Sequence, residues 1–122
     1  MAITFNLSVE NKTLKVIASG KDDSYEDVTN YLKAVIETAT KHLCTAVFCD
    51  ERNLEYSLST IDTYRLAEEA SKKASSTARV AIVCNKKYIE EGKFYETVAS
   101  NRGLRVFVTS DYELAITWLN NK

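Results

Sequence analysis

Hydrophobic and polar residues alternate strictly at the start of the chain. From Ile3 to Val9 every second residue is apolar, a period of two that predicts a strand buried on one face only. After Asn11-Lys12, a second alternating run covers residues 14–18. Asparagine tolerates the left-handed conformation that a tight turn needs, so the two runs predict an antiparallel hairpin whose first strand suits a sheet edge.

Two later runs are apolar at nearly every position. Thr45–Cys49 and Val80–Cys84 are short and rich in residues that favour strands, a pattern typical of strands covered on both faces of a parallel sheet. A third run, Leu104–Thr109, is less completely apolar. It predicts a fifth strand at or near an edge of the sheet.

Four segments show helical spacing or helix-start signals. Between Val28 and Leu43, apolar residues recur at intervals of three and four, which predicts an amphipathic helix. A serine followed three residues later by an acidic residue marks a helix start. Such pairs begin at Ser24, Ser59 and Ser110, and they predict the starts of the first, second and fourth helices.

The third predicted helix follows Asn85–Tyr88 and ends at Gly103, a residue suited to the left-handed position after a helix. Gly92 lies within it, where glycine costs about 1 kcal/mol relative to alanine. We interpret Gly92 as a kink, a close backbone contact, or a sign that the helix begins near Lys93.

The predicted order is therefore ββαβαβαβα, an α/β fold with one mixed five-stranded sheet. An N-terminal antiparallel hairpin is followed by right-handed crossovers between parallel strands. The chain has 122 residues and is 45% apolar, which suits one hydrophobic core. We expect a single domain over residues 1–122.

Charge and composition exclude several classes of function. Sixteen basic and seventeen acidic residues are spread along the chain, which argues against nucleic acid or an anionic membrane surface as the main partner. No apolar run approaches the length of about 18 residues that a membrane span needs, and Met1-Ala-Ile-Thr4 lacks the basic start of a signal peptide. The sequence predicts a cytoplasmic protein with no membrane span.

The sequence predicts no metal site and no cofactor. The spacing of Cys44, Cys49 and Cys84 matches no zinc pattern, and His42 is the only imidazole. Cys49 and Cys84 lie in apolar strands, where a thiol acts as a small buried hydrophobe. We interpret His42 as a residue of the last turn of the first helix, where positive charge is favourable.

The acidic residues after the third strand do not suggest catalysis. Asp50 and Glu51 are adjacent, and adjacent strand residues point to opposite faces of a sheet. Their carboxylates therefore do not converge on one ion or one proton. No nucleophile is paired with a base, so the sequence predicts a protein that is not an enzyme.

The end of the third strand is nevertheless the place where we expect function, because ligands of open α/β sheets bind at the carboxyl ends of strands. Apolar side chains occupy a segment there that would be expected to be polar. Together with neighbouring residues they form a candidate surface, namely Asp50, Leu54, Tyr56, Leu58, Tyr64 and Tyr88. Three interpretations stay open: a patch for a partner, a pocket for an apolar ligand, or core covered by a loop.

The chain resembles the STAS fold, and most closely its SpoIIAA-like branch. The likeness rests on the strand ending Val47-Phe-Cys-Asp50, on the strand Arg79–Val83, and on Asn101–Phe107 followed by Ala115–Leu119. Their order and spacing extend over nearly the whole chain. The resemblance implies a non-enzymatic interaction module.

The resemblance also implies candidate phosphorylation sites. In anti-anti-sigma members of the wider family, a serine at the start of the helix after the third strand is phosphorylated, which breaks binding to a kinase partner. The corresponding segment here is Ser57-Leu-Ser-Thr60, without the family's Asp-Ser-Ser-Gly pattern. Ser57 and Ser59 are therefore the candidates, although helix capping alone also explains the position of Ser59.

The same general fold is similar to part of the CRAL-TRIO lipid-binding domains, which implies a second class of function. We expect the chain to bind a protein partner through the loop after the third strand and the start of the second helix. The alternative is a small apolar ligand or lipid held in a pocket at the same end of the sheet. Association into a homo-oligomer stays open.

Overall fold

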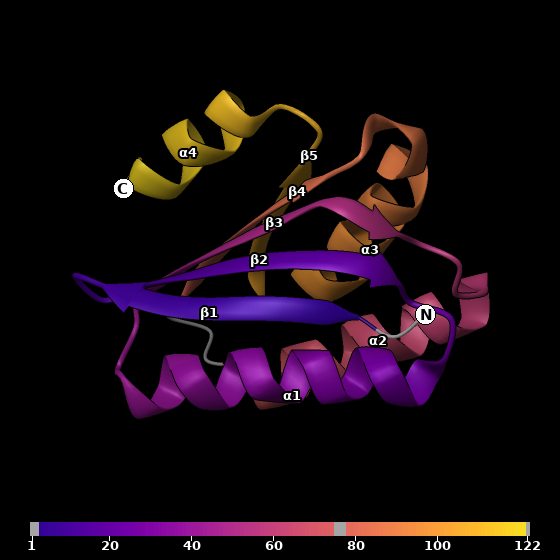
Figure 1. The fold of residues 1–122 in the computed structure, drawn as a ribbon, viewed down its shortest axis with the longest axis horizontal. Coiled ribbons are helices and arrows are strands. Elements are labelled where there is room, and N and C mark those ends of the chain that lie inside the picture. Colours follow the sequence, from indigo (N-terminus) through magenta and orange to yellow (C-terminus); the bar gives the residue numbers. More distant parts are fainter. Residues whose placement is uncertain (1–2, 75–77, 122) are drawn as a thin grey trace.

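A computed structural model describes residues 3–74 and 78–121 of the chain. Five strands form one sheet with helices on both faces (Figure 1). The order of elements confirms the predicted ββαβαβαβα arrangement, with a short 3-10 turn, η1, added before the third helix. The elements are β1 (Thr4–Glu10), β2 (Thr13–Lys21), α1 (Tyr25–Lys41), β3 (Ala46–Glu55), α2 (Thr60–Lys73), β4 (Arg79–Cys84), η1 (Lys86–Tyr88), α3 (Ile89–Asn101), β5 (Arg105–Thr109) and α4 (Tyr112–Asn120).

The strands lie side by side in the order in which they occur in the chain, β1-β2-β3-β4-β5. β1 pairs with β2 antiparallel and every other pair is parallel, as the sequence predicted. Asn11 and Lys12 have φ values of 51° and 64°. Two successive positive φ values belong to the hairpin turn whose twist matches the flanking strands.

The helices are divided unequally between the two faces of the sheet. α1, α2 and α3 cover one face and α4 alone covers the other (Figure 1). Right-handed crossovers between strands in sequential order place all connecting helices on the same face. Because α4 follows the last strand, it is free of that constraint, and it packs through Ala115 against Phe48, Ala81 and Val83.

β3 is longer than the sequence suggested. It continues through the charged residues to Glu55 because it stays paired with β2 as far as Lys21. The pairing shifts register between Ile17 and Ser19, which face Asp50 and Asn53, so β3 contains one extra residue there. Such a β-bulge changes the alternation of side chains. As a result, Glu51 and Leu54 both face the layer of α1–α3.

Helix starts follow the predicted chemistry, with one correction. The hydroxyls of Ser24 and Ser59 accept hydrogen bonds from the backbone N–H groups of Asp27 and Asp62, each at 3.1 Å. For α4, the prediction of Ser110 was wrong, and Asp111 is the cap. Serine and aspartate are almost equally good caps, so spacing alone did not separate two adjacent candidates.

Gly92 lies inside α3 at a close contact with β5. A Cβ atom built on Gly92 would lie 2.7 Å from Cγ1 of Val108 and 3.4 Å from Sγ of Cys84. Of the three interpretations of this glycine, the structure supports the close backbone contact.

Replacing Gly92 with alanine tests this contact. Overpacking costs about 1–3 kcal/mol, whereas the gain in helix propensity is about 1 kcal/mol. We therefore expect Gly92→Ala to lower the free energy of unfolding by up to about 2 kcal/mol in urea denaturation. In a Val108→Ala background the added methyl group has room, so the cost should largely vanish. An equal cost in both backgrounds would contradict the explanation.

Candidate functional site

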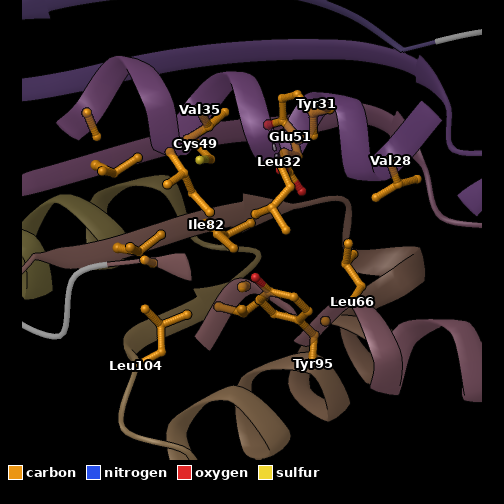
Figure 2. A pocket seen from close by; sticks show the side chains of 18 of the residues that line it. Val28, Tyr31, Leu32, Val35, Cys49, Glu51, Leu66, Ile82, Tyr95 and Leu104 are labelled. Atoms are coloured by element: carbon orange, nitrogen blue, oxygen red, sulfur yellow. Dashed lines mark hydrogen bonds between the residues drawn. The ribbon is translucent and has the colours of Figure 1, made fainter. Parts of the chain in front are cut away.

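A cavity of about 410 Å³ lies between the sheet and the layer formed by α1, α2 and α3. Figure 2 shows side chains of α1 on one side of it and those of Leu66 and Tyr95 on the other. The apolar stripe of α1 that the sequence predicted faces this space, through Val28, Val35 and neighbouring residues. Pockets for small molecules in proteins measure about 300–1,000 Å³.

The cavity exists because small side chains line the part of the layer opposite α1. α2 contributes Ala70, Ala74 follows directly after α2, and α3 contributes Gly92. The strands contribute mainly valine, isoleucine and leucine, and none of the described lining residues is phenylalanine or tryptophan. Larger side chains at Ala70 and Ala74 would reduce this volume.

One end of the cavity holds a buried carboxyl group. Glu51 is only 7% exposed. Its Oε2 accepts a hydrogen bond of 2.8 Å from the hydroxyl of Tyr31, and its Oε1 accepts one of 2.5 Å from the hydroxyl of Tyr56. Burial raises the pKa of Glu51, and the two hydrogen bonds offset part of this effect.

The tyrosines around Glu51 keep their protons. Burial, followed by the nearby charge of Glu51, raises the pKa values of Tyr31 and Tyr56 well above the ordinary value. The same two causes raise the pKa of Tyr95, whose side chain also lines the cavity. All three hydroxyls are therefore neutral hydrogen-bonding groups at neutral pH.

A second buried acid closes the polar end of the cavity. Asp22 is 6% exposed and accepts hydrogen bonds from the backbone N–H of Ser57 and, at 3.1 Å, from its hydroxyl. Its own N–H donates to the carbonyl of Glu55 at 3.1 Å. Burial raises the pKa of Asp22 as well. These bonds join the segment before α1 to the segment after β3.

The structure brings together four of the six predicted surface residues. Leu54, Tyr56 and Leu58 line the cavity. Tyr88 packs on Tyr56, with 5.7 Å between ring centroids. These four residues therefore lie at an apolar pocket, which was one of the three interpretations of the candidate surface.

Asp50 lies apart from the cavity, on the opposite face of the sheet. Its two oxygens accept hydrogen bonds from Nε and a terminal nitrogen of Arg52, at 2.9 and 2.8 Å. Those bonds are the main reason why the pKa of Asp50 is lowered. Asp50 and Glu51 thus point to opposite faces, as the strand geometry predicted.

Tyr64 also lies apart from the cavity, on the outer side of α2. Its hydroxyl accepts a hydrogen bond of 2.7 Å from Arg102, which also pairs with Glu68 at 2.9 Å. This contact joins α2 to the end of α3.

The two candidate serines have different surroundings. The hydroxyl of Ser57 is bonded to Asp22, where a phosphate would meet a carboxylate of like sign. Ser59 is exposed and caps α2. Neither arrangement tests phosphorylation, which stays a prediction.

Three important residues of the cavity were missed as site residues. Glu51 was considered as an acid or a metal ligand and set aside, and Tyr31 and Tyr95 were not among the candidate site residues. The sequence did hold a signal for Glu51. Because Asp50 and Glu51 point to opposite faces of the sheet, one of the two carboxyl groups has to point into the fold.

Among the described residues, no group of three metal-binding side chains is close enough to hold an ion. Within the same residues, no helix has the length and apolar content that crossing a bilayer requires.

Comparison with solved structures identifies the fold. An anti-sigma factor antagonist from Mycobacterium paratuberculosis matches with a TM-score of 0.69 at 12% identity, covering 98% of this chain and 96% of the other. The unphosphorylated anti-sigma factor antagonist SpoIIAA matches with a TM-score of 0.60 at 14% identity, covering 94% and 95%. The chain has a STAS fold of the SpoIIAA-like type.

A third solved structure is itself described as having a SpoIIAA-like fold. This uncharacterised DUF3478-family protein with a SpoIIAA-like fold, from Shewanella loihica PV-4, matches with a TM-score of 0.52 at 22% identity, covering 97% of this SpoIIAA-like domain and 94% of the other chain. No protein-family model matches the sequence, and a search of curated proteins found no match. At these identities the likeness concerns the fold.

The raised pKa of Glu51 predicts how stability depends on pH. The folded state binds this proton more tightly than the unfolded state, so stability falls as pH rises through the folded pKa. Glu51→Gln removes this titration. We expect the variant to be more stable than the wild type at about pH 8, with the difference shrinking toward pH 4.5, the ordinary pKa of the group.

Denaturation by urea at a series of pH values measures this difference. The exposed residue Glu90 offers the control, because Glu90→Gln makes the same change in net charge without altering a buried group. Parallel stability profiles for Glu51→Gln and the wild type would contradict the burial of an ionisable carboxyl at the cavity.

Proposed function

We propose that this SpoIIAA-like domain acts by binding rather than by catalysis, and that it holds a small apolar ligand between the sheet and α1–α3. The observation that carries this proposal is the cavity of about 410 Å³ with its largely aliphatic lining. Protein interiors are normally packed with few voids larger than a water molecule. A bound ligand therefore explains a space of this size better than loose packing does.

The lining favours an apolar occupant. Burial of apolar surface contributes about 25 cal/mol per Å², and most of the surface that faces the cavity belongs to aliphatic side chains such as Val47, Ile82 and Leu104. Leu43 also lines the cavity, although this residue is 73% exposed. This residue marks a place where the cavity reaches the surface.

Fluorescence of N-phenyl-1-naphthylamine, an apolar dye, tests the proposal directly. The dye should bind the wild-type protein with saturable enhancement. Ala39→Phe fills part of the cavity from α1, and we expect it to weaken binding by about tenfold or more, since overpacking costs about 1–3 kcal/mol.

Ala34 provides the matched control. It lies on the same helix and is partly exposed, but it does not line the cavity. Ala34→Phe should therefore leave dye binding unchanged. Equal effects of the two variants, or no saturable binding by the wild type, would overturn the proposal.

A protein partner is the second candidate, at the surface formed by the loop after β3 and the start of α2. Ile61 is 72% exposed there and Tyr64 is 39% exposed. Exposed apolar residues at a helix start are suited to contact a partner. The likeness to two anti-sigma factor antagonists supports an interaction role of this kind.

Ser59 distinguishes a cap from a switch at this surface. If Ser59 acts only as a cap, Ser59→Ala lowers the free energy of unfolding by about 1 kcal/mol and leaves dye binding intact. Mass spectrometry of the protein isolated from its own cells would show no phosphate on Ser57 or Ser59. A phosphorylated serine, or an unchanged unfolding energy, would contradict the capping explanation.

A further inference from the structure

The charged residues around the cavity all have the same sign. Asp22, Glu51 and Glu91 line it, and the described lining contains no lysine, arginine or histidine. Asp22 and Glu51 are buried, while Glu91 is exposed. The lining of the cavity therefore carries acidic groups without a basic side chain beside them.

Glu51 has unused capacity for hydrogen bonds. The hydroxyls of Tyr31 and Tyr56 supply one donor to each oxygen, whereas a carboxylate offers about four acceptor positions. No ion pair to Glu51 is present within residues 3–74 and 78–121. Buried carboxylates in proteins are normally paired with a positive charge.

Tyr95 presents a second polar group to the same space. Figure 2 shows its ring reaching from α3 into the cavity, with the hydroxyl oxygen toward the interior. In the described part of the chain, this hydroxyl has no hydrogen-bond partner. Tyrosine rings also attract cations to their faces, and Tyr31 and Tyr56 lie at the same end as Glu51.

Building on the proposed ligand function, we propose that the ligand is an amphipathic cation, with an ammonium head at Glu51 and an apolar chain along the rest of the cavity. The head donates hydrogen bonds to the carboxylate of Glu51 and to the oxygen of Tyr95. The chain contacts the aliphatic side chains between α1 and the sheet. The positive charge is the partner that the buried carboxylate lacks.

Other head groups fit this arrangement less well. A fatty acid would place a carboxylate beside acidic residues, with no basic side chain of the lining to receive it. A neutral alcohol would donate one hydrogen bond to Glu51 but leave its charge unpaired. Head-group preference is therefore the property that separates this ligand class from other apolar molecules.

Displacement of N-phenyl-1-naphthylamine by decylamine, decanol and decanoic acid measures that preference in the wild-type protein. At about pH 8 an alkylamine is still protonated. We expect decylamine to displace the dye at a concentration about tenfold lower than decanol, and decanoic acid to be the weakest competitor. Equal displacement by decylamine and decanol, or stronger displacement by decanoic acid, would overturn the inference.

Glu51→Gln tests the residue assigned to the head. This variant should lose the preference for decylamine over decanol and retain binding of decanol within about threefold. Glu90→Gln, the exposed control, should keep the preference. If Glu51→Gln retains the preference, the assignment to Glu51 is wrong. If the variant does not fold, the three-ligand comparison in the wild-type protein still decides the ligand class.

The same experiment separates failure of this inference from failure of the proposed function. If the dye and decanol bind but decylamine has no advantage, the cavity binds apolar ligands and only the preference for a cation is wrong. If neither the dye nor any decyl compound binds, the proposed function fails and this inference fails with it.

Discussion

A carboxyl group removed from water must be hydrogen-bonded, and the way in which Glu51 meets this requirement organises one end of the molecule. Tyr31 reaches it from α1 and Tyr56 from the segment after β3. The two bonds connect a helix to a segment that follows a strand on the opposite side of the cavity. This end is thereby held by polar contacts, while the remainder is lined by apolar side chains that do not fill the space between them.

The division of helices between the two faces follows from the connections between strands. Sequential parallel strands with right-handed crossovers place α1–α3 on one face, so this face carries a layer of three helices with the cavity beneath it (Figure 1). The other face has α4 packed directly on Phe48 and its neighbours. The same sheet thus has a tightly covered face and a face with room for a ligand.

The two candidate functions share one segment of the chain. Residues 56–58 contribute side chains to the cavity and bonds to Asp22, and the next residue, Ser59, caps α2. The exposed start of α2 therefore follows directly in the chain after residues that line the cavity. A ligand beside Tyr56 and a partner at Ile61 would contact opposite ends of the same short segment.

The sequence by itself determined the order of elements and most of their boundaries. The reason is that each strand and helix carries its own period of apolar residues, and the turns at Asn11 and Gly103 have local conformational requirements. It also determined that Asp50 and Glu51 point apart, since this follows from strand geometry alone. Only the tertiary structure decided that Glu51 is the inward member. Alternation along β3 puts Glu51 on the same face as Val47 and Cys49, and the tertiary structure decides that α1–α3 cover this face. The bulge, which depends on pairing with β2, then brings Leu54 to the same face. The cavity likewise depends on how far α1 stands from small residues of α2 and α3, a distance between segments remote in the chain that no local pattern encodes.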